Sequence, residues 1–97
     1  MPQNPLVPRY GGNASKLNIT ASTVVKATPG TLFRVNVTTA GSAAGAVYDA
    51  STTGGNTAAN LIAELPNTVG TYELEWPCAA GILVVPGTSQ VISVAFA

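Results

Sequence analysis

Short segments of alternating apolar and polar residues, rich in β-branched side chains, constrain the fold of this chain more than any other feature. Such alternation places one set of side chains on each face of an extended strand. Turn signals such as Pro29-Gly30 and Pro86-Gly87 separate the segments at roughly eight to twelve residues, which predicts an all-β sandwich or small jelly roll. We expect about seven strands in a single domain, at Asn18–Lys26, Thr31–Thr39, Ala46–Ser51, Asn60–Leu65, Thr71–Trp76, Gly81–Val85 and Ser89–Phe96.

The stretch around the only Trp and the only Cys is expected to form the centre of the sandwich. Tyr72, Leu74 and Trp76 fall on one face of an extended chain, which predicts that they point into the core. Pro77 lacks an N–H for a sheet ladder and is expected to end that strand. Ile82–Val85 is apolar on both sides, as in a strand that is covered on both faces.

Two further segments give simpler expectations. In Thr31–Thr39 the alternation predicts that Phe33, Val35 and Val37 face inward. Thr52–Asn60 is too polar and too rich in glycine to pack well, so we expect it to form a flexible loop.

The N-terminal residues differ in composition from the rest, so we divide the chain into an arm, 1–16, and a β-sandwich domain, 17–97. Three prolines at three-residue spacing favour an extended, polyproline-like arm. One interpretation is a floppy tail. The other is an arm that lies across a neighbouring molecule, anchored by Leu6, Val7 and Tyr10, whose stiffness lowers the entropy lost on docking.

Charge is scarce in this chain. Only 8% of the residues are charged and the formal net charge is zero, whereas a typical soluble domain has about 25% charged residues. Zero net charge promotes association. The composition therefore indicates either a neutral monomer or, as we favour, a subunit packed permanently against copies of itself or against a larger particle.

The same composition argues against other classes of partner. The four basic residues are scattered, and they form no stripe for the phosphates of a nucleic acid. The chain has no apolar run of membrane-spanning length and no N-terminal apolar segment of the secretory kind. We therefore expect no nucleic-acid or membrane partner, and synthesis in the cytosol without secretion.

Catalytic chemistry has few candidate residues, because the chain lacks histidine. Glu73 and Glu75 share one face of a strand at a separation of roughly 7 Å, which a paired-carboxylate hydrolase would use. The same pair with Asp49 could bind Ca²⁺, although no dense acidic loop supports such a site. A solvated strand face explains both glutamates better, and Cys78 is best explained as a small buried hydrophobe. We expect no catalytic residue, no metal and no cofactor.

Two tyrosines, Tyr10 and Tyr48, do not alternate with core residues. Aromatic side chains often anchor interfaces between proteins. Together with Leu6 and Val7 they form our candidate interface residues.

Three motifs, ITASTVVKATPGTLFRV, TAGSAAGAVYDA and VGTYELEWPCAAGILVVPGTSQ, give the chain a recognisable pattern. Over roughly residues 16–97 it resembles a family of short β-rich structural proteins of tailed bacteriophages. The resemblance implies a component of the virion and no catalytic residue. The Pro-rich residues 1–15 lie outside the matching region.

The resemblance and the low charge together favour a capsid decoration (cement) protein, made in the host cytoplasm and located on the capsid surface. We expect a homo-oligomer, with a trimer favoured, that bridges subunits of the major capsid protein. The alternative is a head-fibre or tail adhesion module that binds a host receptor or glycan through Thr52–Asn60 and exposed aromatics. An enzyme is the third hypothesis and would need an active site without histidine.

Overall fold

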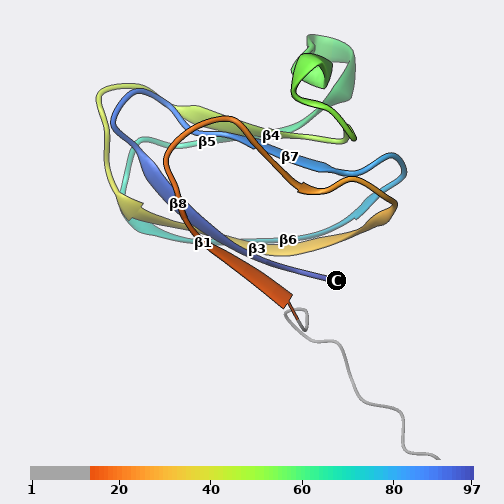
Figure 1. The fold of residues 1–97 in the computed structure, drawn as a ribbon. Helices are drawn as coiled ribbons and strands as arrows, with labels where there is room; N and C mark the ends of the chain where they lie inside the picture. The colour runs from red at the N-terminus through yellow and green to blue at the C-terminus, as the bar shows by residue number, and fades with distance from the viewer. Residues whose placement is uncertain (1–13) are drawn as a thin grey trace, which may run out of the picture.

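The computed structural model describes residues 14–97, which form two four-stranded antiparallel sheets packed face to face (Figure 1). The strands are β1 (Ala14–Ile19), β2 (Thr23–Lys26), β3 (Gly30–Thr39), β4 (Gly45–Tyr48), β5 (Leu61–Leu65), β6 (Gly70–Cys78), β7 (Ile82–Val85) and β8 (Val91–Phe96). The first sheet has the order β1-β8-β3-β6 and the second the order β2-β7-β4-β5. The predicted all-β sandwich is confirmed, with eight strands rather than seven in the described part of the chain.

The core lies between the two sheets and is almost entirely aliphatic. Burying one Val, Leu or Ile side chain stabilises the fold by about 1.5–3 kcal/mol, so the alternation of apolar residues supplies most of the driving force. The prediction that Val35 and Val37 face inward is confirmed. The buried residues of this core are Ile19, Leu32, Val35, Val37, Val47, Leu65, Cys78, Ile82, Val84, Ile92 and Val94.

Strand β7 is buried on both faces, as its sequence predicts. Ile82 and Val84 belong to the core between the sheets, and Leu83, on the other face, is also fully buried. In register, Leu83 lies between Val24 of β2 and Tyr48 of β4. The connection from β4 to β5, with its two short 3-10 turns, rises on this outer side of the second sheet (Figure 1).

Strand β6 is an edge strand, so the expectation that it lies at the centre of the sandwich is wrong. It continues through Pro77 to Cys78, because at an edge the missing N–H can face solvent. Tyr72 and Leu74 pack against the core, but Trp76 is 47% exposed and the prediction of a core Trp is wrong. Trp76 is exposed because it lies on an edge strand, beyond a bulge at Glu75.

That bulge also changes which residues of β3 face inward. Arg34 pairs with Glu73 and Leu32 with Trp76, so β6 has one residue more than β3 between these pairs. Opposite β8 it is β3 that has the extra residue, Phe33. The alternation slips by one position here, and Leu32 is buried while Phe33 is only half-buried, which corrects the prediction that Phe33 faces inward.

The segment Asn18–Lys26 was expected to be one strand, but it forms two strands in different sheets. Strand β1 ends at Ile19. Its register against β8 shifts between Lys16 and Ile19, where Asn18 has a φ of 57°, in the left-handed region that Asn tolerates better than most residues. Strand β1 then pairs with β8, and β2 with β7. Strand β1 begins at Ala14, so three residues placed in the arm by composition belong to the first sheet.

One buried polar side chain, Gln90, connects two turns at one end of the sandwich. Its Oε1 accepts the Gly87 N–H at 2.9 Å, and its Nε2 donates to the Pro66 carbonyl at 3.1 Å. Gln90 is 1% exposed, so these bonds satisfy polar groups that water cannot reach. The side chain therefore fixes the turn before β8 against the end of β5.

Candidate interaction surface

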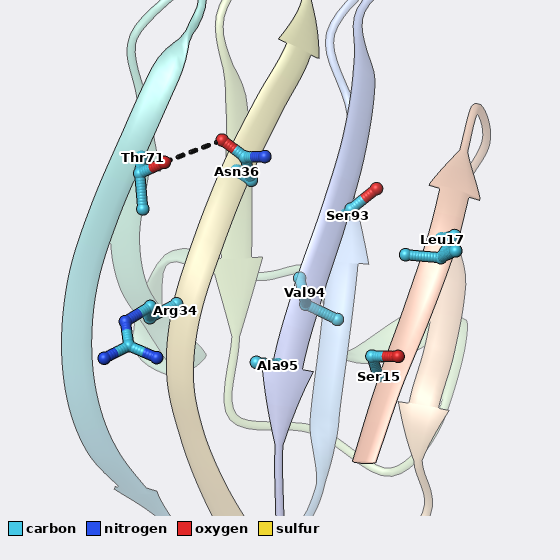
Figure 2. Close-up of a pocket in the computed structure, with 8 residues that line it drawn as sticks. All are labelled: Ser15, Leu17, Arg34, Asn36, Thr71, Ser93, Val94 and Ala95. Carbon is cyan, nitrogen blue, oxygen red and sulfur yellow. Dashed lines mark hydrogen bonds between the residues drawn. The ribbon is translucent and has the colours of Figure 1, made fainter. Parts of the chain in front are cut away.

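The outer face of the first sheet carries a shallow groove of about 340 Å³ (Figure 2). Ala95 and Ser93 of β8 have short side chains, whereas Leu17 on β1 and Arg34 on β3 are longer, so the middle of this face is low. In register, Ala95 lies between Ser15 of β1 and Arg34. The groove is lined by Ser15, Leu17, Arg34, Asn36, Thr71, Ser93, Val94 and Ala95.

The charges at this groove neutralise each other. Arg34 Nε lies 3.3 Å from Glu73 Oε2, and both side chains are well exposed. An exposed pair of this kind stabilises the fold by at most about 1 kcal/mol, so its main effect is on the surface potential. Beside it, the Thr71 hydroxyl donates to Asn36 Oδ1 at 2.9 Å (Figure 2). The outer face thus offers hydrogen-bonding groups with little net charge.

Strand β1, the edge strand opposite β6 in the first sheet, adds an apolar side chain to this surface. Every residue of β1 from Ala14 to Asn18 is exposed, and Leu17 is 68% exposed. The exposed large apolar residues in the described part of the chain are Leu17, Leu61, Val69 and Trp76. Of these, only Leu17 lines the groove.

Of the four predicted interface residues, only Tyr48 lies within residues 14–97. Leu6, Val7 and Tyr10 are outside the described residues. Tyr48 ends β4, is half-buried, and lines a second groove of about 250 Å³ together with Glu64 and Pro86. This groove belongs to the second sheet, so Tyr48 does not contribute to the groove of the first sheet.

Asp49 holds the turn between β6 and β7. Its carboxylate accepts the N–H groups of Ala79 at 2.9 Å, Ala80 at 2.7 Å and Gly81 at 3.3 Å. Burial raises the pKa of the Asp49 carboxyl, but the three N–H donors outweigh that effect and hold its pKa below the ordinary value. The oxygens that the Ca²⁺ hypothesis would use are therefore occupied within the fold.

The other candidates for chemistry also have structural explanations. Glu73 pairs with Arg34, and Glu75 lies at the bulge with a φ of 49°, which interrupts the alternation expected to align the two glutamates. Burial, with a smaller contribution from the Asp49 charge, raises the pKa of the Cys78 thiol to about 11, so it stays protonated near neutral pH. Within residues 14–97, no three acidic or Cys side chains gather where they could hold a metal ion.

The groove itself was not predicted, although the sequence contains a signal for it. Val91, Ser93 and Ala95 share one face of the last strand, opposite Ile92, Val94 and Phe96, and short side chains on an outer face leave a low surface. What the sequence does not give is the order of the strands. Only the pairing of β1 and β3 with β8 brings Leu17 and Arg34 to either side of these residues.

Comparisons with protein-family models, with curated proteins and with solved structures found no match for this chain. The resemblance to phage structural proteins stays a prediction from the quoted motifs. Among residues 14–97, no helix is long and apolar enough to cross a membrane.

Proposed function

We propose that this chain is a non-enzymatic structural subunit of a bacteriophage particle. In this proposal it is a capsid decoration protein that associates with copies of itself and bridges neighbouring capsid subunits on the virion surface. The observation that carries the proposal is the outer face of the first sheet, a broad surface of small and polar side chains with one neutralised ion pair. The cores of protein interfaces are depleted of charged residues in the same way.

The sandwich architecture suits a bridging role. The core lies between the sheets, so the outer face of the first sheet with its groove, and the groove beside Tyr48 on the second sheet, are available for contacts. A subunit that lies across the joint between two capsid proteins adds buried area to both. A stable contact of this kind buries about 1,200–2,000 Å², so we expect the whole first face to take part.

The test is to fill the groove and measure binding to capsids. In the variant Ala95→Glu, the new carboxylate fills the low middle of the face beside Arg34, which can pair with it, so the fold is expected to survive. We expect at least about tenfold weaker binding to purified capsids, because a charge would have to be buried at the contact. The matched control is Ala58→Glu, an exposed alanine in the connection between β4 and β5.

Both variants are first checked by circular dichroism and thermal unfolding. The proposal predicts capsid binding for the wild type and for Ala58→Glu, together with greater resistance of the decorated capsids to heat. Wild-type protein that does not bind capsids, or an Ala95→Glu variant that binds as well as wild type, would contradict it.

The second groove favours the alternative function, an adhesion module. Tyr48 and Glu64 place an aromatic ring and a carboxylate on one shallow site, and these groups stack on and hydrogen-bond to sugars. Binding to a glycan array that is lost in Tyr48→Ala, with no effect of the protein on capsid stability, would support this function over decoration.

A further inference from the structure

Four side chains form a row across the outer face of the first sheet, and the described chain begins at one end of it. In register, Ser15 of β1 lies beside Ala95 of β8. Ala95 also lies beside Arg34 of β3, which pairs in turn with Glu73 of β6. Neighbouring strands are about 4.8 Å apart, so the row is about 14 Å long. Because Ala14 directly precedes Ser15, the residues before Ala14 join the sheet at the β1 end of this row.

The groove around Ala95 has the size and the lining to hold one aromatic ring. Its volume is about 340 Å³, and Leu17 and Arg34 stand on either side of it (Figure 2). Leu17 offers an apolar contact, and the planar guanidinium of Arg34 can stack on an aromatic face. The side chains of Ser93 and Asn36 also line the groove and can hydrogen-bond to a phenol. This combination suits a tyrosine, which has an apolar ring and a polar tip.

The sequence places a tyrosine within reach of the groove. Tyr10 lies four residues before Ala14, and residues 11–13 between them are Gly-Gly-Asn. Glycine and asparagine favour turns in which a chain reverses its direction. Four residue steps span at most about 14 Å, whereas Ala95 lies one strand spacing, about 4.8 Å, from β1. The connection is therefore long enough to place Tyr10 over Ala95.

Charge complementarity favours the same placement. Among residues 1–13 the one charged side chain is that of Arg9, next to Tyr10. The Glu73 side chain is 63% exposed, and within residues 14–97 its ion pair is with Arg34, through Oε2. If Tyr10 lies over β8, Arg9 follows along the row toward β6, where its guanidinium can pair with Glu73. An exposed pair of this kind contributes at most about 1 kcal/mol, so it orients the segment more than it holds it.

We propose that Tyr10 and Arg9 of the same chain occupy this groove in the free protein, with the Tyr10 ring over Ala95, between Leu17 and Arg34. A segment tethered through so few residues has an effective concentration of about millimolar, which a separate molecule reaches only at high concentration. The inference rests on the proposed function, in which the capsid uses the same groove, and it adds regulation to that site. A capsid must displace Tyr10 before it can pack against the sheet.

A pair of cysteines tests the contact directly. In the full chain carrying Tyr10→Cys and Ala95→Cys, mild oxidation is expected to form a disulfide within one molecule, seen as the loss of two free thiols from a monomer. The matched control combines Tyr10→Cys with Glu64→Cys, because Glu64 is exposed on the second sheet. Cys78 is buried in both proteins. Equal cross-linking of the two pairs, or a disulfide that joins two molecules of the first variant, would overturn the inference.

Trypsin supplies a readout that needs no added cysteine. Cleavage after Arg9 requires the segment to leave the groove, so its rate follows the population of the released form. The wild type and Val69→Ser are expected to be cleaved there at the same rate, because Val69 is exposed but lies outside the groove. Leu17→Ser removes the apolar wall of the groove and is expected to be cleaved at least about threefold faster. Equal rates for all three proteins would overturn the inference.

Capsid binding separates this inference from the proposed function. Oxidised Tyr10→Cys/Ala95→Cys protein is expected to bind capsids at least about tenfold more weakly than the same protein after reduction, because the disulfide keeps the segment in the groove. Equal binding of the two forms would overturn the competition and leave the function standing. A disulfide that forms in a protein whose wild type ignores capsids would remove the function and leave the groove contact.

Discussion

Asp49 shows how a single side chain can hold together parts of the chain that are far apart in sequence. Its carboxylate accepts hydrogen bonds from three N–H groups in the turn that connects β6 of the first sheet to β7 of the second. The sequence did not reveal this role, because an isolated Asp after a strand can equally be a solvated turn residue or a metal ligand. The partners lie about thirty residues away, at Ala79–Gly81, and only the three-dimensional fold brings them to the carboxylate.

We predict that Asp49→Ala destabilises the protein by about 1 kcal/mol, because it removes the charged acceptor of three N–H groups, of which those of Ala79 and Ala80 are exposed and can bond to water instead. Urea unfolding followed by Trp fluorescence measures the change. The control is Glu64→Ala, an exposed acidic residue, which should change the free energy of unfolding by less than about 0.5 kcal/mol. Equal changes in the free energy of unfolding for the two variants would show that the Asp49 carboxylate does not stabilise this turn in solution.

The same carboxylate gives the protein a pH dependence of known sign. Its pKa is lower in the folded chain than the ordinary value of 3.8, so the unfolded chain binds the proton more tightly. The stability that Asp49 contributes is therefore fully present above pH values near the ordinary pKa, and it is lost as the pH falls through the folded pKa. Wild-type stability should fall more steeply below about pH 4 than that of Asp49→Asn, whose amide does not titrate there. Parallel curves for the two proteins would contradict this assignment.

At the scale of the strand, alternation predicted which segments extend but not where the alternation slips. Val35 and Val37 face inward as expected, yet one extra residue at Phe33 moves Leu32 into the core. A bulge of this kind depends on the strands that pair with β3, so it cannot be predicted from the residues of β3 alone. Trp76 was misplaced for a related reason, since its strand lies at an edge and strand order is set by tertiary pairing.

Strand β7 was the most accurately predicted element, and it gives a direct test of packing. Leu83 is fully buried on the outer face of the second sheet. Leu83→Ala should destabilise the fold by about 2–5 kcal/mol, the cost of removing a buried Leu side chain. Leu17→Ala, at an exposed position in β1, should cost less than about 0.5 kcal/mol. Thermal unfolding compares the two, and a mild effect of Leu83→Ala would show that its outer face is open to solvent.

At the scale of the whole molecule, the chain forms a small sandwich in which buried groups hold the fold together and the outer face of the first sheet remains for contacts. The polar anchors, Asp49 and Gln90, act within the fold. The candidate surface instead combines the groove of the first sheet with the open edge of β1. The fold class followed from composition and alternation, whereas this surface required the strand order, which brings β1, β8 and β3 side by side.

In the proposed function, this surface packs against a capsid. The most direct measurement is a density map of the intact particle at a resolution that shows strands. We expect copies of the sandwich arranged with capsid symmetry over the joints between subunits, with the outer face of the first sheet in contact with the capsid. Particles without the chain, or with the chain confined to the tip of a fibre or tail, would contradict it.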